Sequence, residues 1–516
     1  MSATRRAGWW QRASVGPRAG DSWLGARLSA LRGVLATVPR TAWVCALLAV
    51  LNAVCWSLIT PPFLALDEPD HFAYVQLLAE TGRLPSSSEV EYSQAEQVAL
   101  ADLHHGQVRF RPAGRPIFFL AQQEKLEHDL AQPLSMVGPG SVGVAASEPP
   151  LYYALATIPY AIGSSGSILD QLELIRLLSA VLAGVTALFV FLFLREALPR
   201  VKWAWTVGGL AVALGPLLAF SSSTVNPDAL LIAISASIFY CLARAFRHGL
   251  TWRSAIVLGT LVAAGLLTKL NFAGMAPGVA IGLILLTRRE AKRSGPSAYY
   301  RMLAPALAIA LSPGVIYGMV NILSKHHTFG LVSGGATALT AASHSISGAL
   351  SYIWQFYLPR LPWMHNDFDG VFTTRQIWFR NVIGLYGWGD TAFPNWVYDF
   401  ALIPFLAIVA SCARALVLGR AALRVRIPEL LTYALMSLGL LTLVGASGYL
   451  SFPATAAEFT DARYLLPLVV LWAAILALAA RGAGRRWGPA VGALIVLLII
   501  GHDIFSQLQV VARYYG

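Results

Sequence analysis

The stretch T41-AWVCALLAVLNAVCWSLITPPFLALDEPD-H71 decides the fold of this chain. It opens with about 20 apolar residues, the length that crosses the hydrocarbon core of a bilayer as an α-helix. These residues do not alternate between polar and apolar, so they predict a helix and not a strand of a membrane barrel. A cluster of acidic residues follows the apolar run directly. The stretch therefore predicts a transmembrane helix with a polar segment at one membrane surface.

The whole chain has the composition of a membrane protein. Of its 516 residues 56% are hydrophobic and 12% are charged, whereas a soluble protein carries about 25% charged residues. The mean hydropathy is +0.61. We therefore expect an all-α polytopic membrane protein with about eleven transmembrane helices. The predicted spans are 41–62, 172–196, 203–222, 227–247, 253–270, 274–288, 302–323, 396–418, 428–450, 462–480 and 488–508.

Most of the positive charge lies in short clusters between these spans, which is typical of cytoplasmic loops. Residues 1–40 are basic and lead into a full-length span without a cleavage site, so we expect a disordered cytoplasmic tail and a signal anchor. The predicted N-terminus is cytoplasmic and the predicted C-terminus is outside. The net charge of +12 does not indicate nucleic acid as a partner, because no soluble domain with a contiguous basic face is present.

This topology divides the chain into four parts. After the tail, residues 41–323 form a transmembrane core that includes a first outer loop at 63–171. Residues 324–395 form a second outer loop that is rich in aromatic residues, and 396–516 form the C-terminal transmembrane helices. The aromatic faces of the second loop suit sugar rings or prenyl chains, and they equally suit an aromatic belt at the membrane interface.

Residues 148–163 of the first outer loop are apolar but too short to span a membrane. A span here would also invert the orientation of every later loop. We therefore expect a juxtamembrane helix lying in the interface, with Tyr152, Tyr153 and Tyr160 at the level of the headgroups.

The acidic segment after the first span predicts another short helix, over residues 66–82. Asp67 suits the N-cap, Pro69 suits the first turn, and Gly82 suits the position after the last turn. Phe72 and Val75 then form an apolar stripe that suits the bilayer surface. A plain alternative is that Asp67 only caps the helix and that the acidic residues form a solvated first turn.

The same segment also carries candidate chemistry. Asp67 and Glu68 lie within four residues of His71, so the three side chains share one face of a helix. An ionised carboxylate at the membrane surface can act as a general base toward a hydroxyl group. Asp67 and Glu68 are also candidate ligands of a divalent cation, Mg²⁺ or Mn²⁺.

Other polar residues are predicted at the same level of the membrane. Lys269 and Arg463 interrupt apolar stretches and are candidate ligands of a phosphate. Arg463 could instead pair with Asp461 or Glu458, and Arg176 could simply extend toward the headgroups. The full set of candidate binding residues is Arg176, Asn226, Asp228, Lys269, Asn271, Arg463 and Tyr464.

Taken in order, these motifs resemble a known superfamily. Asp67-Glu68-x-x-His71 is followed by Pro149-Pro-Leu-Tyr-Tyr153 and by a span that contains Arg176-Leu-Leu-Ser-Ala-Val-Leu-Ala-Gly184. The further motifs are Thr224-Val-Asn-Pro-Asp228, Thr268-Lys-Leu-Asn271 and Asp461-Ala-Arg-Tyr464. The pattern resembles the GT-C membrane glycosyltransferases most clearly over residues 40–275. Within that superfamily it is most similar to a bacterial family of predicted integral membrane proteins.

The resemblance implies a GT-C-like bundle that moves a sugar from a polyprenyl-phosphate donor to a glycan or lipid acceptor of the cell envelope. The reaction would take place at the outer face of a bacterial cytoplasmic membrane. By position, Asp67 matches the first-loop Asp that is implicated in GT-C enzymes as catalytic base or metal-linked acid, and Asp228 matches an acidic residue of the next outer loop. Glu68 stands where many members have Asp. The alternatives are a transporter or flippase of a lipid-linked glycan, and a glycan polymerase or ligase.

Overall fold

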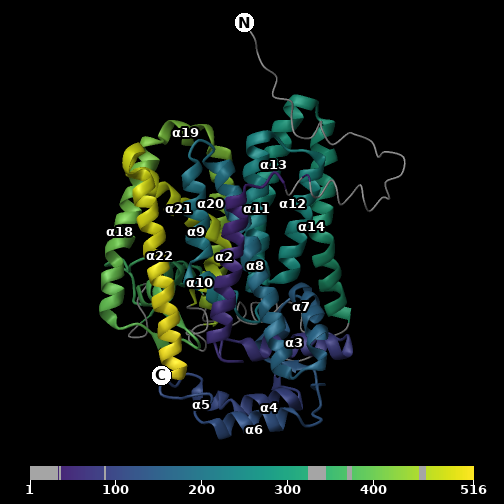
Figure 1. The fold of residues 1–516 in the computed structure, drawn as a ribbon. Coiled ribbons are helices and arrows are strands. Elements are labelled where there is room, and N and C mark those ends of the chain that lie inside the picture. The colour runs from purple at the N-terminus through teal and green to yellow at the C-terminus, as the bar shows by residue number, and fades with distance from the viewer. Residues whose placement is uncertain (1–32, 34–35, 86–88, 324–344, 369–374, 452–460) are drawn as a thin grey trace.

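A computed structural model of the chain describes residues 33, 36–85, 89–323, 345–368, 375–451 and 461–516. The predicted disorder of the basic tail therefore concerns residues that lie almost wholly outside this description. The described part is a helical bundle with two short antiparallel sheets of two strands each (Figure 1). In the first, β1 (Val90–Glu91) pairs with β2 (Ser141–Val142), and in the second, β3 (Leu385–Tyr386) pairs with β4 (Thr391–Ala392). The predicted all-α fold is confirmed.

Eight helical segments of the described residues are long and apolar enough to cross a membrane. They are α2 (Arg40–Ile59), α8 (Ile168–Ala197), α11 (Asp228–His248), α14 (Ser297–Leu323), α18 (Asn395–Leu418), α20 (Ile427–Ser451), the 3₁₀-helix η6 (Ala462–Leu468) continued by α21 (Val469–Gly482), and α22 (Gly484–Tyr515). All eight fall on predicted spans.

The other three predicted spans are also helical, but they are shorter or less apolar. They are α9 (Lys202–Ala213) with α10 (Pro216–Ser221), α12 (Trp252–Thr268) and α13 (Ala276–Ser294). The first is interrupted at Gly215 because Pro216 cannot donate the next helical hydrogen bond. The polytopic architecture is therefore confirmed, and the count of eleven spans stays a prediction.

The helices of the first predicted outer loop gather at one end of the bundle, together with the C-terminus (Figure 1). We call this the outer end. The elements are α3 (Glu68–Thr81), α4 (Gln94–Asp102), α5 (His105–Val108), α6 (Leu120–Leu130), η2 (Gly143–Ser147), α7 (Leu151–Ile162) and η3 (Gly163–Ser165). The short α19 (Arg420–Val425) lies at the opposite end, which we call the inner end.

The helices α3 and α7 are present as predicted, but their apolar faces do not lie on a membrane surface. Phe72, Val75, Tyr152 and Tyr153 are fully buried in the main core of the protein, because α3 and α7 pack on each other and α7 packs on α8. The tyrosines are therefore not at the headgroups, which corrects the expectation. The exposed face of α7 carries aliphatic residues instead, Leu155, Ile158 and Ile162.

Part of the second predicted outer loop is also folded. It contains α16 (Ile346–Tyr357), the π-helical turn η5 (Arg375–Arg380) and α17 (Asn381–Gly384), whereas 324–344 and 369–374 lie outside the described residues. Its aromatic side chains largely pack on one another: Tyr357 stacks on Trp378 with ring centroids 5.1 Å apart. Trp363 and Trp396 are exposed.

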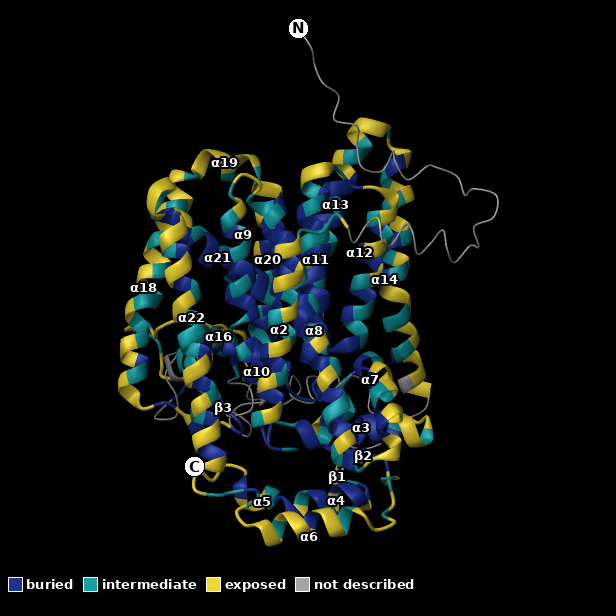
Figure 2. Ribbon diagram, viewed as in Figure 1, coloured by how far each residue is buried: buried dark blue, intermediate teal, exposed yellow. Residues whose placement is uncertain are grey.

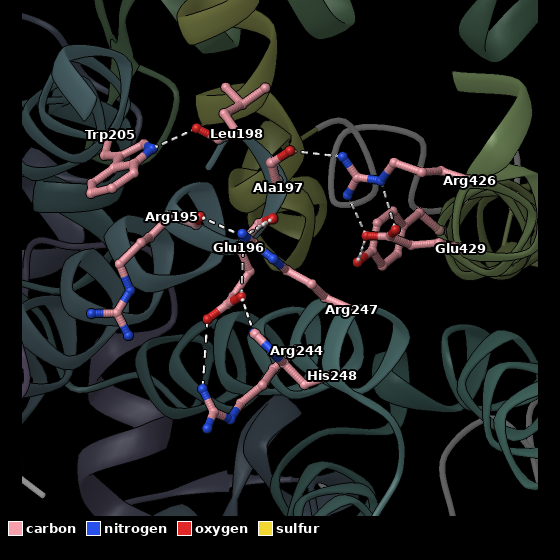
Figure 3. Close-up of polar contacts among 11 residues, drawn as sticks. Arg195, Glu196, Ala197, Leu198, Trp205, Arg244, Arg247, His248, Arg426 and Glu429 are labelled. Carbon is pink, nitrogen blue, oxygen red and sulfur yellow. Dashed lines mark hydrogen bonds and ion pairs between the residues drawn. The ribbon is translucent and has the colours of Figure 1, made fainter. Parts of the chain in front are cut away.

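Buried polar contacts fix the inner ends of α8 and α11. Glu196 near the end of α8 pairs with His248 at 3.0 Å and with Arg247 at 3.4 Å, both on α11 (Figure 3). Arg426 donates to the Ala197 carbonyl oxygen at 2.7 Å while pairing with Glu429. Arg247 also donates to the carbonyl oxygens of Arg195 and Glu196, so the last carbonyl groups of a 30-residue helix are satisfied. These bonds also fix the register between α8 and α11. Helix α11 is mostly buried at the centre of the bundle (Figure 2).

The C-terminal helix is fixed to the outer end in a similar way. Arg513 of α22 donates to the carbonyl oxygens of Arg111 at 2.7 Å and Gly114 at 2.6 Å, and it pairs with Asp390 at 2.9 Å. One side chain thus joins α22, the loop after α5 and the turn between β3 and β4.

Candidate active site

Asp67 sits between the first span and α3 in a left-handed backbone conformation, with φ 61° and ψ 7°. It occupies the N-cap position, but its side chain makes no capping hydrogen bond, so the expected capping role is wrong. Pro69 lies in the first turn and Gly82 ends the helix with φ 66°, both as predicted. The left-handed backbone turns the Asp67 carboxylate away from the helix end, and its Oδ2 accepts a 2.6 Å hydrogen bond from Arg463 Nη2.

Arg463 lies at the start of η6, far from Asp67 in the sequence. Asp461 caps this turn by accepting a hydrogen bond of 2.9 Å from the Arg463 backbone N–H. Its other carboxylate oxygen lies 3.0 Å from Arg463 Nε. The Arg463 side chain is only 9% exposed, while that of Asp67 is 23% exposed. The guanidinium is thus held between two carboxylates, and one of them reaches the surface of the site.

Asp228 and Lys269 form the next pair. Lys269 follows the last residue of α12 in an extended conformation, and its Nζ lies 2.8 Å from Oδ1 of Asp228 at the start of α11. Asn226 supports this turn by accepting a 2.9 Å hydrogen bond from the Asp228 backbone N–H. Oδ2 of Asp228 is 3.9 Å from Arg463 Nε. Asp228 therefore lies between the two cations and links them.

A further carboxylate, Glu148, also belongs to this cluster. It immediately precedes Pro149 and α7, and its Oε1 lies 3.9 Å from Lys269 Nζ. Burial raises the pKa of Glu148, and Lys269 opposes part of that rise. Oε2 of Glu148 and Oδ2 of Asp228 are buried and lack a hydrogen-bond partner among the described residues. Two unsatisfied acceptors beside two cations mark a place where a donor group of a ligand can bind.

His71 faces the same cluster from α3. Its Nδ1 is 2.8 Å from the Tyr153 hydroxyl oxygen, and Tyr153 stacks on Tyr74 with ring centroids 3.8 Å apart. Burial lowers the pKa of His71 well below 6.5, and the charges of Lys269 and Arg463 lower it further. The imidazole is therefore neutral at neutral pH and can act as a hydrogen-bonding group toward a ligand.

Glu68, next to Asp67, serves a different purpose. Its carboxylate is fully buried and forms an ion pair with Arg176 of α8, with Oε2 2.6 Å from Nη2 and Oε1 2.8 Å from Nε. It also accepts hydrogen bonds from the backbone N–H groups of Phe63 and Val225. All its acceptor positions are therefore used within the protein.

Arg176 is fully buried too and donates to the carbonyl oxygens of Thr60 at 2.9 Å and Pro61 at 3.1 Å. It neither extends toward the headgroups nor lines the site as a phosphate ligand. Together Glu68 and Arg176 join the end of α2, the start of α3, α8 and the segment before α11. The pair thus fixes the backbone before Asp67 and before Asp228.

The remaining predicted residues lie around the cluster. The Tyr464 ring lies 5.4 Å from both Lys269 Nζ and the Arg463 guanidinium carbon. The Asn226 backbone N–H donates to the Tyr152 hydroxyl at 3.1 Å, so Asn226 positions the turn before α11. Asn271 is half-buried in η4 (Leu270–Gly274), two residues after Lys269. The structure therefore brings Asp67, His71, Asp228, Lys269, Arg463 and Tyr464 together and leaves Glu68 and Arg176 beneath them.

The donor set does not form the predicted cation site. The Asp67 and Glu68 carboxylates point to different arginines, and Glu68 has no free acceptor position. Across the part of the chain that the structure describes, no three His, Cys, Asp or Glu side chains are grouped as ligands of a metal ion. The expectation that Asp67 and Glu68 share a divalent cation is therefore not supported by their geometry.

Sequence reasoning missed Glu148 and Tyr153 as members of the site. Both lie in Glu148-Pro-Pro-Leu-Tyr-Tyr153, which reads as an interfacial helix because its polar residues stand at one end of an apolar run. The useful signal was the acidic residue directly before two prolines. Such a residue is fixed at a helix start, where the backbone is rigid and N–H groups favour a carboxylate.

The sequence matches the model of the family described as "Predicted membrane protein (DUF2142)" over residues 50–472. No curated protein matches the chain. The structure is similar to the Archaeoglobus fulgidus oligosaccharyltransferase tethered with an acceptor peptide, with a TM-score of 0.45 and 13% identity over 92% of this chain and 55% of that chain. It is also similar to the arabinosyltransferase EmbB from Mycobacterium smegmatis, with a TM-score of 0.34 and 14% identity over 98% of this chain and 43% of that chain.

The chain thus spans about half the length of these two proteins. The expected kinship with predicted integral membrane proteins is confirmed by the family match, which covers most of the chain. This protein belongs to the DUF2142 family of predicted membrane proteins.

Proposed function

We propose that the protein is a membrane glycosyltransferase that moves a sugar from a polyprenyl-phosphate donor to a hydroxyl group of a glycan or lipid acceptor. The observation that carries the proposal is the placement of Asp67. Its carboxylate is partly exposed, oriented by Arg463, and adjacent to a second cation, Lys269, through Asp228. One general base and two cations are the groups that such a transfer needs.

In the proposed reaction Asp67 takes the proton of the acceptor hydroxyl. The acceptor oxygen forms a bond to the anomeric carbon of the sugar, and the bond between that carbon and the phosphate oxygen breaks. The leaving lipid phosphate takes up the electron pair. Lys269 and Arg463 stabilise its negative charge, and the polyprenyl phosphate itself supplies the activated leaving group.

The contacts of Asp228 support this assignment of the cations. Its carboxylate already lies 2.8 Å from Lys269 and 3.9 Å from Arg463, so the two cations are spaced to share one anion. A phosphate placed on the exposed side of the pair would meet the same two groups. Arg463 can offer it two parallel N–H donors and Lys269 a point charge.

The proposal places the reaction at the outer face of a bacterial cytoplasmic membrane, with a cytoplasmic N-terminus and the C-terminus outside. Support comes from the Arg-rich predicted cytoplasmic loops: α19, which belongs to one of them, lies at the inner end, whereas α3, which directly follows Asp67, lies at the outer end (Figure 1). The order of the motifs, which resembles GT-C enzymes, agrees with this placement. A transporter would instead place ionisable groups along a path through the middle of the bundle.

The substitution Asp67→Asn tests the proposal. Asn has nearly the shape of Asp and tolerates the left-handed backbone, so the fold is kept while the base is lost. We expect turnover to fall by about 10²-fold or more. The matched control is Asp129→Asn on the exposed α6, which should leave turnover unchanged.

Two measurements decide the outcome. Mass spectrometry of envelope glycans from a deletion strain should show a missing sugar that the wild-type gene restores and the Asp67→Asn gene does not. Accumulation of a lipid-linked glycan in the inner leaflet would instead indicate a flippase, and shortened chains would indicate a polymerase. Near-normal transfer by the Asp67→Asn protein would refute the role of Asp67.

A further inference from the structure

An apolar groove lies between α9 and α22, away from the acidic cluster. Its volume is about 530 Å³, and four side chains from each helix line it. The apolar side chains that form its walls are Trp203, Val207 and Leu210 from α9 and Ala493, Val496 and Leu497 from α22. Spacings of three, four and seven residues place each set on one face of its helix.

The bottom of the groove forms because two glycines let the helices approach closely. A Cβ atom at Gly488 would lie 2.8 Å from the Trp203 ring, and one at Gly492 would lie 2.7 Å from the Val207 side chain. The spacing Gly488-x-x-x-Gly492 is typical of close helix contacts in membranes. The two helices are therefore in close contact at Gly488 and Gly492, and the apolar groove lies beside this contact.

The groove starts at the inner end, where both helices begin. It follows α22 from Pro489 to Leu497, a rise of about 12 Å. That length is less than half of a hydrocarbon core about 30 Å thick. The groove therefore lies at the depth of the acyl chains of a single leaflet.

Three exposed cations precede the lining residues of the groove in the first turns of the two helices. Lys202 directly precedes Trp203, and Arg485 and Arg486 precede Pro489 by four and three residues. None of the three forms an ion pair with another described residue, and no acidic residue occurs in 198–212 or 481–498. The N-termini of both helices add positive dipole ends at the same place.

We propose that this groove binds an anionic diacyl phospholipid of the leaflet at the inner end. Its acyl chains lie along the walls of α9 and α22, and its phosphate contacts Lys202, Arg485 and Arg486. Basic residues next to an intramembrane groove are the usual recognition elements for such headgroups. The site lies at the opposite end from Asp67, so the proposal is independent of the proposed transferase activity.

Native mass spectrometry of the full chain released from nanodiscs tests the proposal. The nanodiscs contain equal amounts of dioleoylphosphatidylglycerol and dioleoylphosphatidylcholine. We expect the wild-type chain to retain phosphatidylglycerol selectively. Lys202→Gln/Arg485→Gln/Arg486→Gln should reduce that retention by about fivefold for each cation removed, because each contributes roughly 1 kcal/mol to binding an anionic headgroup.

The charge-matched control is Arg253→Gln/Arg420→Gln/Arg424→Gln, which removes three exposed cations on α12 and α19, elements that contribute no residue to the groove. It should retain phosphatidylglycerol like the wild type. In a second pair, Ala493→Trp fills the groove without changing charge and should release the lipid, whereas Leu494→Trp, on an exposed face, should not.

Three results would overturn the proposal. They are equal retention of both lipids by the wild type, an equal loss in the charge-matched control, and preferential retention of polyprenyl phosphate over phosphatidylglycerol when both are present. Because the three cations are exposed, their replacement leaves the packing of the bundle unchanged.

Discussion

Arg463 Nη2 donates a 2.6 Å hydrogen bond to Oδ2 of Asp67, a residue 396 positions earlier in the chain. This bond joins the segment after the first span to the segment before α21. It orients the only carboxylate of the first motif that reaches the surface of the site. The first motif alone therefore does not make the candidate site, because its proposed base is positioned by a residue 396 positions later in the chain.

We expect the substitution Arg463→Lys to be nearly as harmful to activity as Arg463→Gln. Arg463 contacts Asp67 through Nη2 and Asp461 through Nε, and a lysine can replace only one of these contacts. The value of kcat/KM for sugar transfer should fall by about 10²-fold for both variants. Recovery of normal kcat/KM in Arg463→Lys would show that charge alone is required.

Removing one partner of the buried pair Glu68–Arg176 should lower the free energy of unfolding strongly, because the other charge is then left buried and unpaired. Arg176→Met leaves an unpaired buried carboxylate and should lower the free energy of unfolding by about 3–5 kcal/mol. The double variant Glu68→Gln/Arg176→Met should lose less than the sum of the two single variants. Thermal unfolding of the detergent-solubilised protein measures both effects, and Arg293→Ala in an exposed pair should cause no measurable shift. Additive losses would contradict this account.

His71 should make stability depend on pH in the acidic range. Its pKa in the folded protein is well below 6.5 because of burial and the nearby cations. As the pH falls below about 6.5, the unfolded chain takes up a proton that the folded protein does not, so stability decreases with falling pH by up to about 1.4 kcal/mol per pH unit. Above pH 6.5 the contribution is constant.

The unfolding temperature measured at pH 5.0 and pH 7.5 checks this prediction. The difference should shrink in His71→Gln and persist in Tyr153→Phe, which keeps the buried imidazole and removes its hydroxyl partner. An unchanged difference in His71→Gln would assign the pH dependence to another group.

Gly439 should be intolerant of any side chain. A Cβ atom there would overlap the carbonyl oxygen of Gly274, where α20 packs directly on η4. We expect Gly439→Ala to cost about 1–3 kcal/mol of stability and to displace the turn that follows Lys269. Gly314→Ala, where the new methyl group meets open space, is the matched control. Equal unfolding temperatures for the two variants would contradict the close packing.

The spans were predictable from sequence because hydrophobic length and loop charge are local properties. The position of the site along the membrane normal was predictable for the same reason. Its main charged residues all lie next to span ends, and the structure brings them together: Asp67, Asp228, Lys269 and Arg463. Their partners were not predictable. Whether Arg463 pairs with Asp461 alone or also with Asp67 depends on how the segment before α3 lies against η6, which no local pattern reports.

The misassigned residues have a common cause. Phe72 and Tyr153 lie on amphipathic helices, and a sequence shows that one face is apolar without showing what covers it. Here α3 and α7 cover each other, so both faces are buried in protein. Glu68 and Arg176 were predicted to be site residues because charged residues within or beside membrane spans usually have a functional role. Here the two side chains instead form a buried ion pair with each other.

The 396-residue separation of Asp67 and Arg463 sets an order for biosynthesis. A chain growing at 5–20 residues per second needs roughly 20–80 s to synthesise Arg463 after Asp67. During that interval the nascent protein holds Asp67 and Asp228 without the arginine that links them. The candidate site is therefore completed only after η6 has been synthesised, and a chain that stops before η6 is released without Arg463.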